Sequence, residues 1–232
     1  MKPRYDTVFF DLDGTITDSA PGILASVRYA LGKFRGETAA VKEDYSDAEL
    51  NFFIGPPLVD SFRKLLGCDE AAANRCVAWY REYYTGASPS SHLPGMLLNR
   101  VYPGVEEALV ILRANGVKIC LATAKPEPYA RRILDHFGLS RHFDFIHGAT
   151  LDETRNRKAQ VIAWALGHSG AVGSAVMVGD RADDVKGAAA NGLETVGALW
   201  GYGGERELVE AGAKALADDI PGAVKFILQG TV

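Results

Sequence analysis

Short runs of largely apolar residues recur along the chain, and each ends in a polar or glycine-rich turn. Five runs stand out, at residues 7–10, 117–122, 144–147, 174–178 and 195–199. They are continuously apolar rather than alternating, which is typical of strands buried on both faces of a parallel sheet. We therefore predict five buried strands.

Helical patterns separate these runs in the second half of the chain. The segments 105–112, 133–137, 161–166 and 182–190 carry apolar residues or alanines at helical spacing, and each is followed closely by a glycine. Glycine after a periodic apolar segment is a common helix stop signal. The alternation of helix and strand predicts an α/β fold, a Rossmann-like doubly wound parallel sheet built from βαβ units.

Residues 18–98 have a different pattern. The stretches 23–31, 58–66 and 77–84 are amphipathic helix candidates, and no convincing strand lies among them. Residues 86–94 are rich in Ser, Pro and Gly, which indicates a loop or linker. We therefore expect a catalytic core of residues 1–17 and 99–232, with a smaller all-helical domain, residues 18–98, inserted after the first strand.

Composition excludes several classes of protein. The 232 residues are 47% hydrophobic and 23% charged, with a net charge of −4, which argues against disorder and against a duplex-binding protein. No apolar run approaches 18 residues and no signal peptide is evident. The three cysteines lack a metal-ligand spacing. We expect a cytoplasmic protein, monomer or homodimer, without nucleic-acid or membrane partners.

Polar side chains follow several of the predicted strands. In an open α/β sheet, ligands bind beyond the carboxyl ends of the strands, so these side chains should converge there. They are Asp11, Asp13, Thr123, Asp180, Asp183 and Asp184, with Lys158 near the start of the helix after the third strand. A cluster of carboxylates repels itself unless a cation is present. Mg²⁺ suits carboxylates combined with water and a substrate phosphate.

The same residues carry a family resemblance. Residues 11–15, Asp-Leu-Asp-Gly-Thr, resemble the first motif of the haloacid dehalogenase superfamily. Thr123 resembles the second motif, Lys158 the third, and residues 179–184 the fourth. The resemblance covers essentially the whole chain, because the insert stands where the family carries its helical cap. It implies a Mg²⁺-dependent phosphoric monoester hydrolase.

The resemblance also implies a role for each residue. Asp11 would attack phosphorus to form an aspartyl-phosphate. Asp13 would be the general acid for the leaving alcohol and then the base for water. Thr123 and Lys158 would bind and stabilise the phosphoryl group. The metal would be held by Asp11, the Asp13 carbonyl, Asp180 and Asp184, or less favourably Asp183. The expected substrate-binding residues are Leu12, Gly14, Thr15, Ala124, Lys125 and Gly55.

Each assignment has a plainer alternative. Asp13-Gly14 alone is an ordinary turn signal, and Thr123 alone would be a helix N-cap. Arg155 and Arg157 compete with Lys158 for its role. Gly14 could turn the backbone so that successive N–H groups form an anion-binding nest. Lys125 could assist the phosphate or face solvent. Arg181 could pair with Asp184 or lower the pKa of the metal carboxylates.

The second Asp decides among the reactions of the superfamily. Carbon-directed dehalogenases resemble the chain but lack an Asp at position 13, so its presence indicates phosphoryl transfer. The branch resembled is phosphoglycolate phosphatase-like or 5′-nucleotidase-like, and the loop 53–58, with Gly55, would reach over the site. Phe53 or Tyr202 would suit a nucleotide, and Arg63 or Lys64 a small acid. The alternatives are a sugar phosphomutase and a non-catalytic binding protein.

Overall fold

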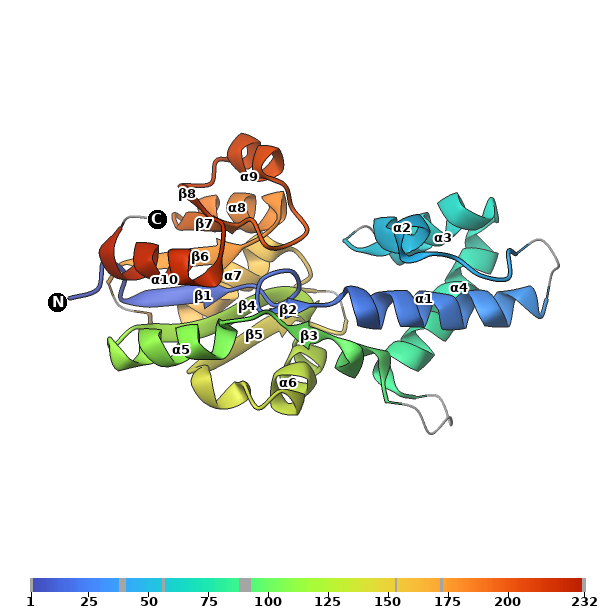
Figure 1. The fold of residues 1–232 in the computed structure, drawn as a ribbon, viewed down its shortest axis with the longest axis horizontal. Helices are drawn as coiled ribbons and strands as arrows, with labels where there is room; N and C mark the ends of the chain where they lie inside the picture. The colour runs from blue at the N-terminus through green and yellow to red at the C-terminus, as the bar shows by residue number, and fades with distance from the viewer. Residues whose placement is uncertain are drawn as a thin grey trace. The chain divides into compact units, whose positions relative to one another are not determined.

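The computed structural model describes residues 2–37, 41–55, 57–87, 93–152, 154–171 and 173–230. They divide into two compact units (Figure 1), Met1–Asp18 with Val101–Val232, and Ser19–Arg100. The chain leaves the first unit after β2 (Thr17–Asp18) and returns through β3 (Arg100–Val101), and these two short strands pair with each other. The sequence analysis placed the corresponding limits at residues 18 and 98.

A six-stranded parallel sheet is the framework of the first unit. Its strands are β1 (Thr7–Phe10), β4 (Lys118–Pro126), β5 (Phe145–Ala149), β6 (Ala175–Gly179), β7 (Glu194–Ala198) and β8 (Ala215–Ala217). They lie in the order β5-β4-β1-β6-β7-β8, and each adjacent pair is parallel. The predicted doubly wound α/β fold is confirmed. It places β1, which the first motif directly follows, in the middle of the sheet.

Helices cover both faces of this sheet. They are α5 (Val105–Ala114), α6 (Glu127–His136), α7 (Lys158–His168), α8 (Ala182–Ala189), α9 (Glu205–Ala211) and α10 (Ile220–Gln229). Phe9 and Met177 pack in one core with residues of α7 and α8. Phe10 faces Leu109 of α5 and Val224 of α10. Successive strand residues point to opposite faces, so both must be apolar, which explains the continuous apolar runs.

The last part of the first unit was missed from the sequence. β8 is only three residues long and lies at the edge of the sheet, where Ala215 and Leu216 are half-buried. Such a short and partly exposed strand lacks the apolar run that marked the others. The N-terminus of α10 is capped by Asp219, whose carboxylate accepts a hydrogen bond from Gly222 N–H.

The second unit is helical in the residues that the structure describes. Its elements are α1 (Ala20–Arg35), α2 (Asp47–Leu50), η1 (Asn51–Phe53), α3 (Leu58–Leu66), α4 (Glu70–Thr85) and η2 (Gly95–Leu98), with the first residue of β3 at its end. The α1 helix packs along α4. Pro56 of the predicted loop and residues 88–92 of the predicted linker lie outside the described residues. None of the described helices has the length and hydropathy needed to span a membrane.

Candidate active site

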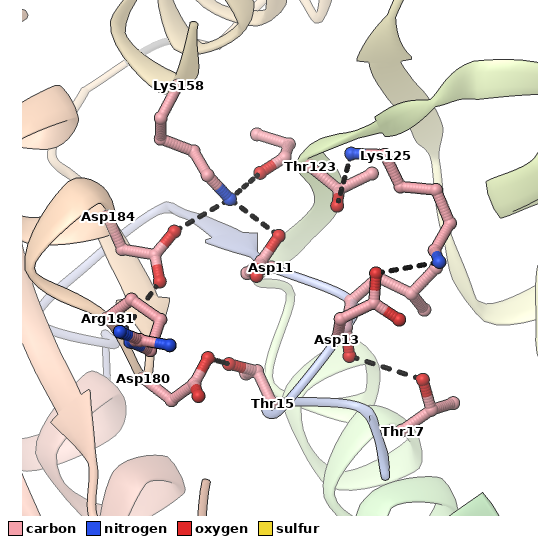
Figure 2. Close-up of polar contacts among 12 residues, drawn as sticks. Asp11, Asp13, Thr15, Thr17, Thr123, Lys125, Lys158, Asp180, Arg181 and Asp184 are labelled. Carbon is pink, nitrogen blue, oxygen red and sulfur yellow. Dashed lines mark hydrogen bonds and ion pairs between the residues drawn. The ribbon is translucent and has the colours of Figure 1, made fainter. Parts of the chain in front are cut away.

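The predicted site residues of the first unit gather at the carboxyl edge of the parallel sheet (Figure 2). Asp11 and Asp13 follow β1, and Thr123 lies near the end of β4. Asp180 follows β6, and Lys158 begins α7. Thr123 is buried and lies within β4, three residues before Pro126, the N-cap of α6, so it is not the helix cap considered as its alternative. Motifs that are far apart in the chain thus form one cluster, because the strands that they follow are parallel and adjacent.

A buried ion-pair network joins Asp11, Lys158 and Asp184. The Lys158 ammonium donates to Asp11 Oδ1 at 2.5 Å and to the Ala122 carbonyl at 3.2 Å, and it lies 2.7 Å from Asp184 Oδ1. All three charged side chains are at least nine-tenths buried. Burial opposes the positive charge of Lys158, but the carboxylates of Asp11 and Asp184 outweigh it and raise the lysine pKa. The lysine is therefore held as a cation beside Asp11.

The two carboxylates of this network and that of Asp180 form a candidate cation site. Asp11, Asp180 and Asp184 each offer an oxygen, and these oxygens lie within 4.8 Å of one another. One lysine does not balance three acids, and an all-oxygen donor set favours a hard divalent cation such as Mg²⁺. Asp184 is buried in this cluster, whereas Asp183 is exposed on the same helix. This geometry favours Asp184 between the two.

Asp180 connects the cluster to the segment that follows β7. It is fully buried, and its carboxylate accepts hydrogen bonds from Tyr202 N–H at 2.8 Å and from the Thr15 hydroxyl at 3.4 Å. Burial, together with the charges of Asp11 and Asp184, raises the pKa of Asp180 to about 7. Without a cation, the folded protein therefore resists full ionisation of this cluster.

Three glycines lie against Asp180 where a larger residue would clash with it. Gly14 has φ +84°, and a methyl group there would lie 2.2 Å from Asp180 Oδ2. A methyl group at Gly201 would lie 2.3 Å from Asp180 Cβ, and one at Gly203 would lie 1.8 Å from the Asp180 carbonyl oxygen. These separations are far shorter than van der Waals contact. The segment after β7 must therefore be glycine-rich to pack on Asp180.

The turn at Gly14, where an anion-binding nest was expected, uses the amides of Gly14 and Thr15 within the loop. Gly14 N–H donates to the Thr17 carbonyl at 2.7 Å, and Thr15 N–H donates to the Leu12 carbonyl at 3.3 Å. The Leu12 carbonyl also accepts from the amides of Ile16 and Thr17. These bonds close a tight turn after β1, so the amides of Gly14 and Thr15 stabilise the loop. The role of Gly14 in this structure is to make room for Asp180.

Asp13 pairs with Lys125 on the other side of Asp11 (Figure 2). Their Nζ–Oδ2 distance is 2.9 Å, and the two side chains are 9% and 27% exposed for Lys125 and Asp13 respectively. Thr123 Oγ1 accepts a hydrogen bond from the Lys125 amide at 3.2 Å, which leaves the threonine hydroxyl proton to donate. The alternative in which Lys125 faces solvent is therefore wrong.

The structure also corrects the expectations for the nearby arginines. The Arg155 guanidinium donates to the Gly148 carbonyl and lies over the Trp164 ring, so it does not replace Lys158. The Arg181 side chain pairs with Glu207, at an Nε–Oε1 distance of 2.9 Å, and only its amide reaches Asp184. The pKa of Asp180 is raised rather than lowered. Glu207, in α9, carried no local signal that sequence reasoning could have used.

The remaining predicted residues are placed as follows. Ala124 is exposed at the end of β4, where it lines an open groove of about 440 Å³ with Lys158 and Asp183. Gly55, in the second unit, is exposed with φ +106°. Phe53, considered as a nucleotide platform, is buried against Phe62 in the core of the second unit, so that suggestion is wrong.

Tyr202 was likewise considered as a nucleotide platform, but its hydrogen bonds fix it within the core unit. Its hydroxyl donates to Asp18 Oδ1 at 2.7 Å, in addition to the bond from its amide to Asp180. The nearby Trp200 indole donates to the Thr15 carbonyl at 3.0 Å. The Trp-Gly-Tyr-Gly sequence of residues 200–203, just after β7, is a signal that could have indicated this supporting role. Its glycines mark a close approach between backbone segments.

Sequence and structure comparisons identify the proteins to which this chain is similar. The profile of the family described as haloacid dehalogenase-like hydrolase matches residues 5–192. A 5′-nucleotidase of Pseudomonas aeruginosa is 39% identical over 206 residues, which cover 88% of this chain and 87% of that protein. A predicted phosphatase from Clostridium acetobutylicum has a crystal structure that matches with a TM-score of 0.80 at 39% identity, covering 96% of this chain and 98% of that one.

A third relative has a different name. The tyrosine-protein kinase PtkA of Mycobacterium tuberculosis is 43% identical over 197 residues, which are 84% of this chain but only 62% of that protein. The family match and the phosphatase-named relatives confirm the sequence-based prediction of a phosphoric monoester hydrolase. The chain belongs to the haloacid dehalogenase-like hydrolase family.

Proposed function

We propose that this protein hydrolyses phosphate monoesters of small metabolites with the help of Mg²⁺, through a phosphorylated Asp11. Nucleoside monophosphates and phosphoglycolate are the candidate substrates. The observation that carries this proposal is the buried cluster of Asp11, Asp180 and Asp184 around Lys158, with Asp13 beside it. Such a cluster combines a nucleophilic carboxylate, a fixed positive charge and oxygen ligands for a cation.

The first half-reaction forms a bond between Asp11 and phosphorus. As the carboxylate attacks, the P–O bond to the alcohol breaks and the leaving oxygen takes a proton from Asp13. Lys158, held 2.5 Å from Asp11, and the Thr123 hydroxyl stabilise the charge on the phosphoryl oxygens. In the second half, Asp13 takes a proton from water as the water attacks the aspartyl-phosphate. This releases phosphate and restores Asp11.

The metal site is assigned to Asp11, Asp180 and the Asp13 carbonyl, with Asp184 supporting the cluster. The close approach of three buried carboxylates to a single lysine supports this assignment. When bound, Mg²⁺ neutralises negative charge on the phosphoryl group and on these acids. Asp184 also holds Lys158, so it orients the lysine as well as the metal shell.

The helical unit, residues 19–100, is proposed as a cap that selects the substrate. Gly55 of this unit, and Leu12 and Ala124 of the core unit, would contact the substrate. Opening and closing of such a unit would admit substrate and exclude water. We further propose a cytoplasmic location, supported by three cysteines that form no disulfide.

Replacing Asp13 with alanine should lower turnover of alkyl phosphates by about 10²–10⁴-fold, the usual contribution of general acid–base catalysis. Aryl phosphates, whose leaving groups need no proton, should lose less in the first step. Steady-state rates on both kinds of ester test the overall loss, and the pre-steady-state burst of p-nitrophenolate tests the first step, with circular dichroism to verify the fold. If the variant keeps most of its rate on every ester, the acid–base role of Asp13 is wrong.

Phosphate release from a panel of esters tests the proposed function itself. The panel holds phosphoglycolate, nucleoside monophosphates, sugar phosphates and p-nitrophenyl phosphate, each with Mg²⁺ and with EDTA. Metal-dependent release supports a phosphatase, and the preferred ester identifies the substrate class. Phosphate exchange between positions of a sugar without net release would indicate a mutase. Transfer from ATP to a tyrosine peptide would indicate a kinase, and binding without reaction a non-catalytic protein.

A further inference from the structure

The two carboxylate oxygens of Asp13 have different surroundings, because only one of them contacts Lys125. Oδ2 lies 2.9 Å from the Lys125 ammonium, and Figure 2 shows the lysine reaching across from β4 to the loop after β1. Oδ1 is shielded from solvent and has no hydrogen-bond partner among the described residues. The two oxygens of Asp13 thus have different surroundings before any substrate is bound.

The backbone explains how Lys125 reaches Asp13. Strand β4 pairs regularly with β5 as far as Thr123, and the register then shifts before Pro126. The irregularity lies at the positions of Ala124 and Lys125, next to the site. Irregularities of this kind re-aim side chains at strand ends. The Lys125 amide is also fixed by its bond to Thr123 Oγ1. The lysine therefore extends from an anchored strand, whereas Asp13 lies in a loop.

We propose that Lys125 is a positioning residue that holds Asp13 through Oδ2 and so fixes the carboxyl group that exchanges protons with the leaving alcohol and with water. This inference rests on the proposed function. As the P–O bond of an alkyl ester breaks, the proton of the Asp13 carboxyl group moves to the leaving oxygen, and the carboxylate that remains is held by Lys125. A general acid must lie about 2.6–3.2 Å from the atom that it protonates, so small displacements of Asp13 are costly.

The alternative is that Lys125 binds the phosphoryl group directly. The two roles differ in what they predict for leaving groups. A lysine that binds phosphate serves every phosphate ester alike, so its loss should raise KM for all of them. In the first step, a lysine that positions Asp13 matters only where the leaving group needs a proton, whereas in the second step it acts on the aspartyl-phosphate that every ester forms. The loss should therefore appear in the rate of aspartyl-phosphate formation from alkyl esters and be small in that rate for p-nitrophenyl phosphate.

The test compares Lys125→Met, Lys125→Arg and Asp13→Asn on an alkyl phosphate and on p-nitrophenyl phosphate, with Mg²⁺. We expect Lys125→Met to lower the single-turnover rate of alcohol release from the alkyl ester by about 10–100-fold, part of the full general-acid contribution. On p-nitrophenyl phosphate the pre-steady-state burst of p-nitrophenolate, which reports the first step alone, should slow by no more than a few-fold, and KM should not rise equally for the two esters. Lys125→Arg should recover most of the alkyl rate. The double variant Asp13→Asn/Lys125→Met should be no slower than Asp13→Asn.

A matched control is Lys214→Met. Lys214 forms an ion pair of the same kind with Glu194, at 3.1 Å, and it precedes β8 at the opposite edge of the sheet. This variant should retain full activity on both esters. Circular dichroism and thermal unfolding verify that every variant is folded.

Three results would overturn the inference. They are an equal rise in KM for both esters, an unchanged alkyl rate in Lys125→Met, and independent losses in the double variant. Failure of the proposed function has a different signature, because the wild-type protein would then release phosphate from neither ester. If the wild type is active and Asp13→Asn is slow, only the role of Lys125 is in question.

Discussion

Replacing Asp11 with asparagine is expected to reduce phosphatase turnover by at least about 10⁴-fold, as the loss of a covalent nucleophile typically does. The amide has nearly the same shape as the carboxylate but does not attack phosphorus. Lys158 would keep its contacts with Asp184 and the Ala122 carbonyl, so its charge stays compensated. The variant should therefore fold, and its defect should lie in kcat.

The matched control for this experiment is Asp183→Asn. Asp183 is an exposed acid in the first turn of α8, next to Asp184, and its replacement changes the net charge by the same amount. It should keep nearly full activity. Mass spectrometry of acid-quenched protein should detect a phosphorylated Asp11 in the wild type and none in Asp11→Asn. Retained turnover in the folded Asp11→Asn variant would exclude Asp11 as the nucleophile.

The core fold was predictable because its sequence signals are local. Strands buried on both faces must be largely apolar, and residues 8–10 and 176–178 are both apolar and buried. The helices α5 and α6 are followed by Gly116 and Gly138, which have positive φ angles. No other residue adopts this left-handed conformation as readily as glycine. β8 escaped notice because an edge strand of three residues needs little apolar surface. Its position depends on its pairing with β7, and such a pairing between distant segments leaves no pattern in the local sequence.

The site was predictable where topology alone brings residues together. Asp11, Asp180 and Lys158 meet because each lies at a strand end or at the helix that follows a strand. Contacts that depend on side-chain direction were not predictable. The pairing of Arg181 with Glu207, and that of Lys125 with Asp13, join positions 26 and 112 residues apart in the numbering. To predict these two ion pairs, one must know the three-dimensional positions of α9 and of the end of β4.

Removing divalent cations with EDTA should abolish phosphatase activity and lower the thermal stability of the protein, more strongly at higher pH. The reason is the pKa of Asp180, which burial and the charges of Asp11 and Asp184 raise to about 7. The unfolded chain ionises this group near its usual value of 3.8. Between these two values the folded state binds a proton that the unfolded state has released. The stability of the metal-free protein therefore falls as pH rises through this window.

A bound cation takes the place of that proton. Magnesium at about 100 times its dissociation constant should stabilise the protein by about 2.7 kcal/mol, which corresponds to roughly 5–10 °C in Tm for a chain of this size. The shift should be larger at pH 8 than at pH 5.5, because protons and Mg²⁺ compete for the same carboxylates. Thermal unfolding at several pH values, with Mg²⁺ and with EDTA, measures it.

Asp180→Asn separates this role of the cluster from its role in the fold. The asparagine oxygen can still accept from Tyr202 N–H, so the segment after β7 keeps its anchor. One fewer buried acid means less repulsion, so the metal-free variant should be more stable than the metal-free wild type above pH 7, yet inactive. It should also lose most of the Mg²⁺-dependent shift in Tm, whereas Asp183→Asn should retain it. A full Mg²⁺ shift in Asp180→Asn would remove Asp180 from the metal site. A variant less stable than the wild type under EDTA would show that Asp180 serves mainly to hold the fold.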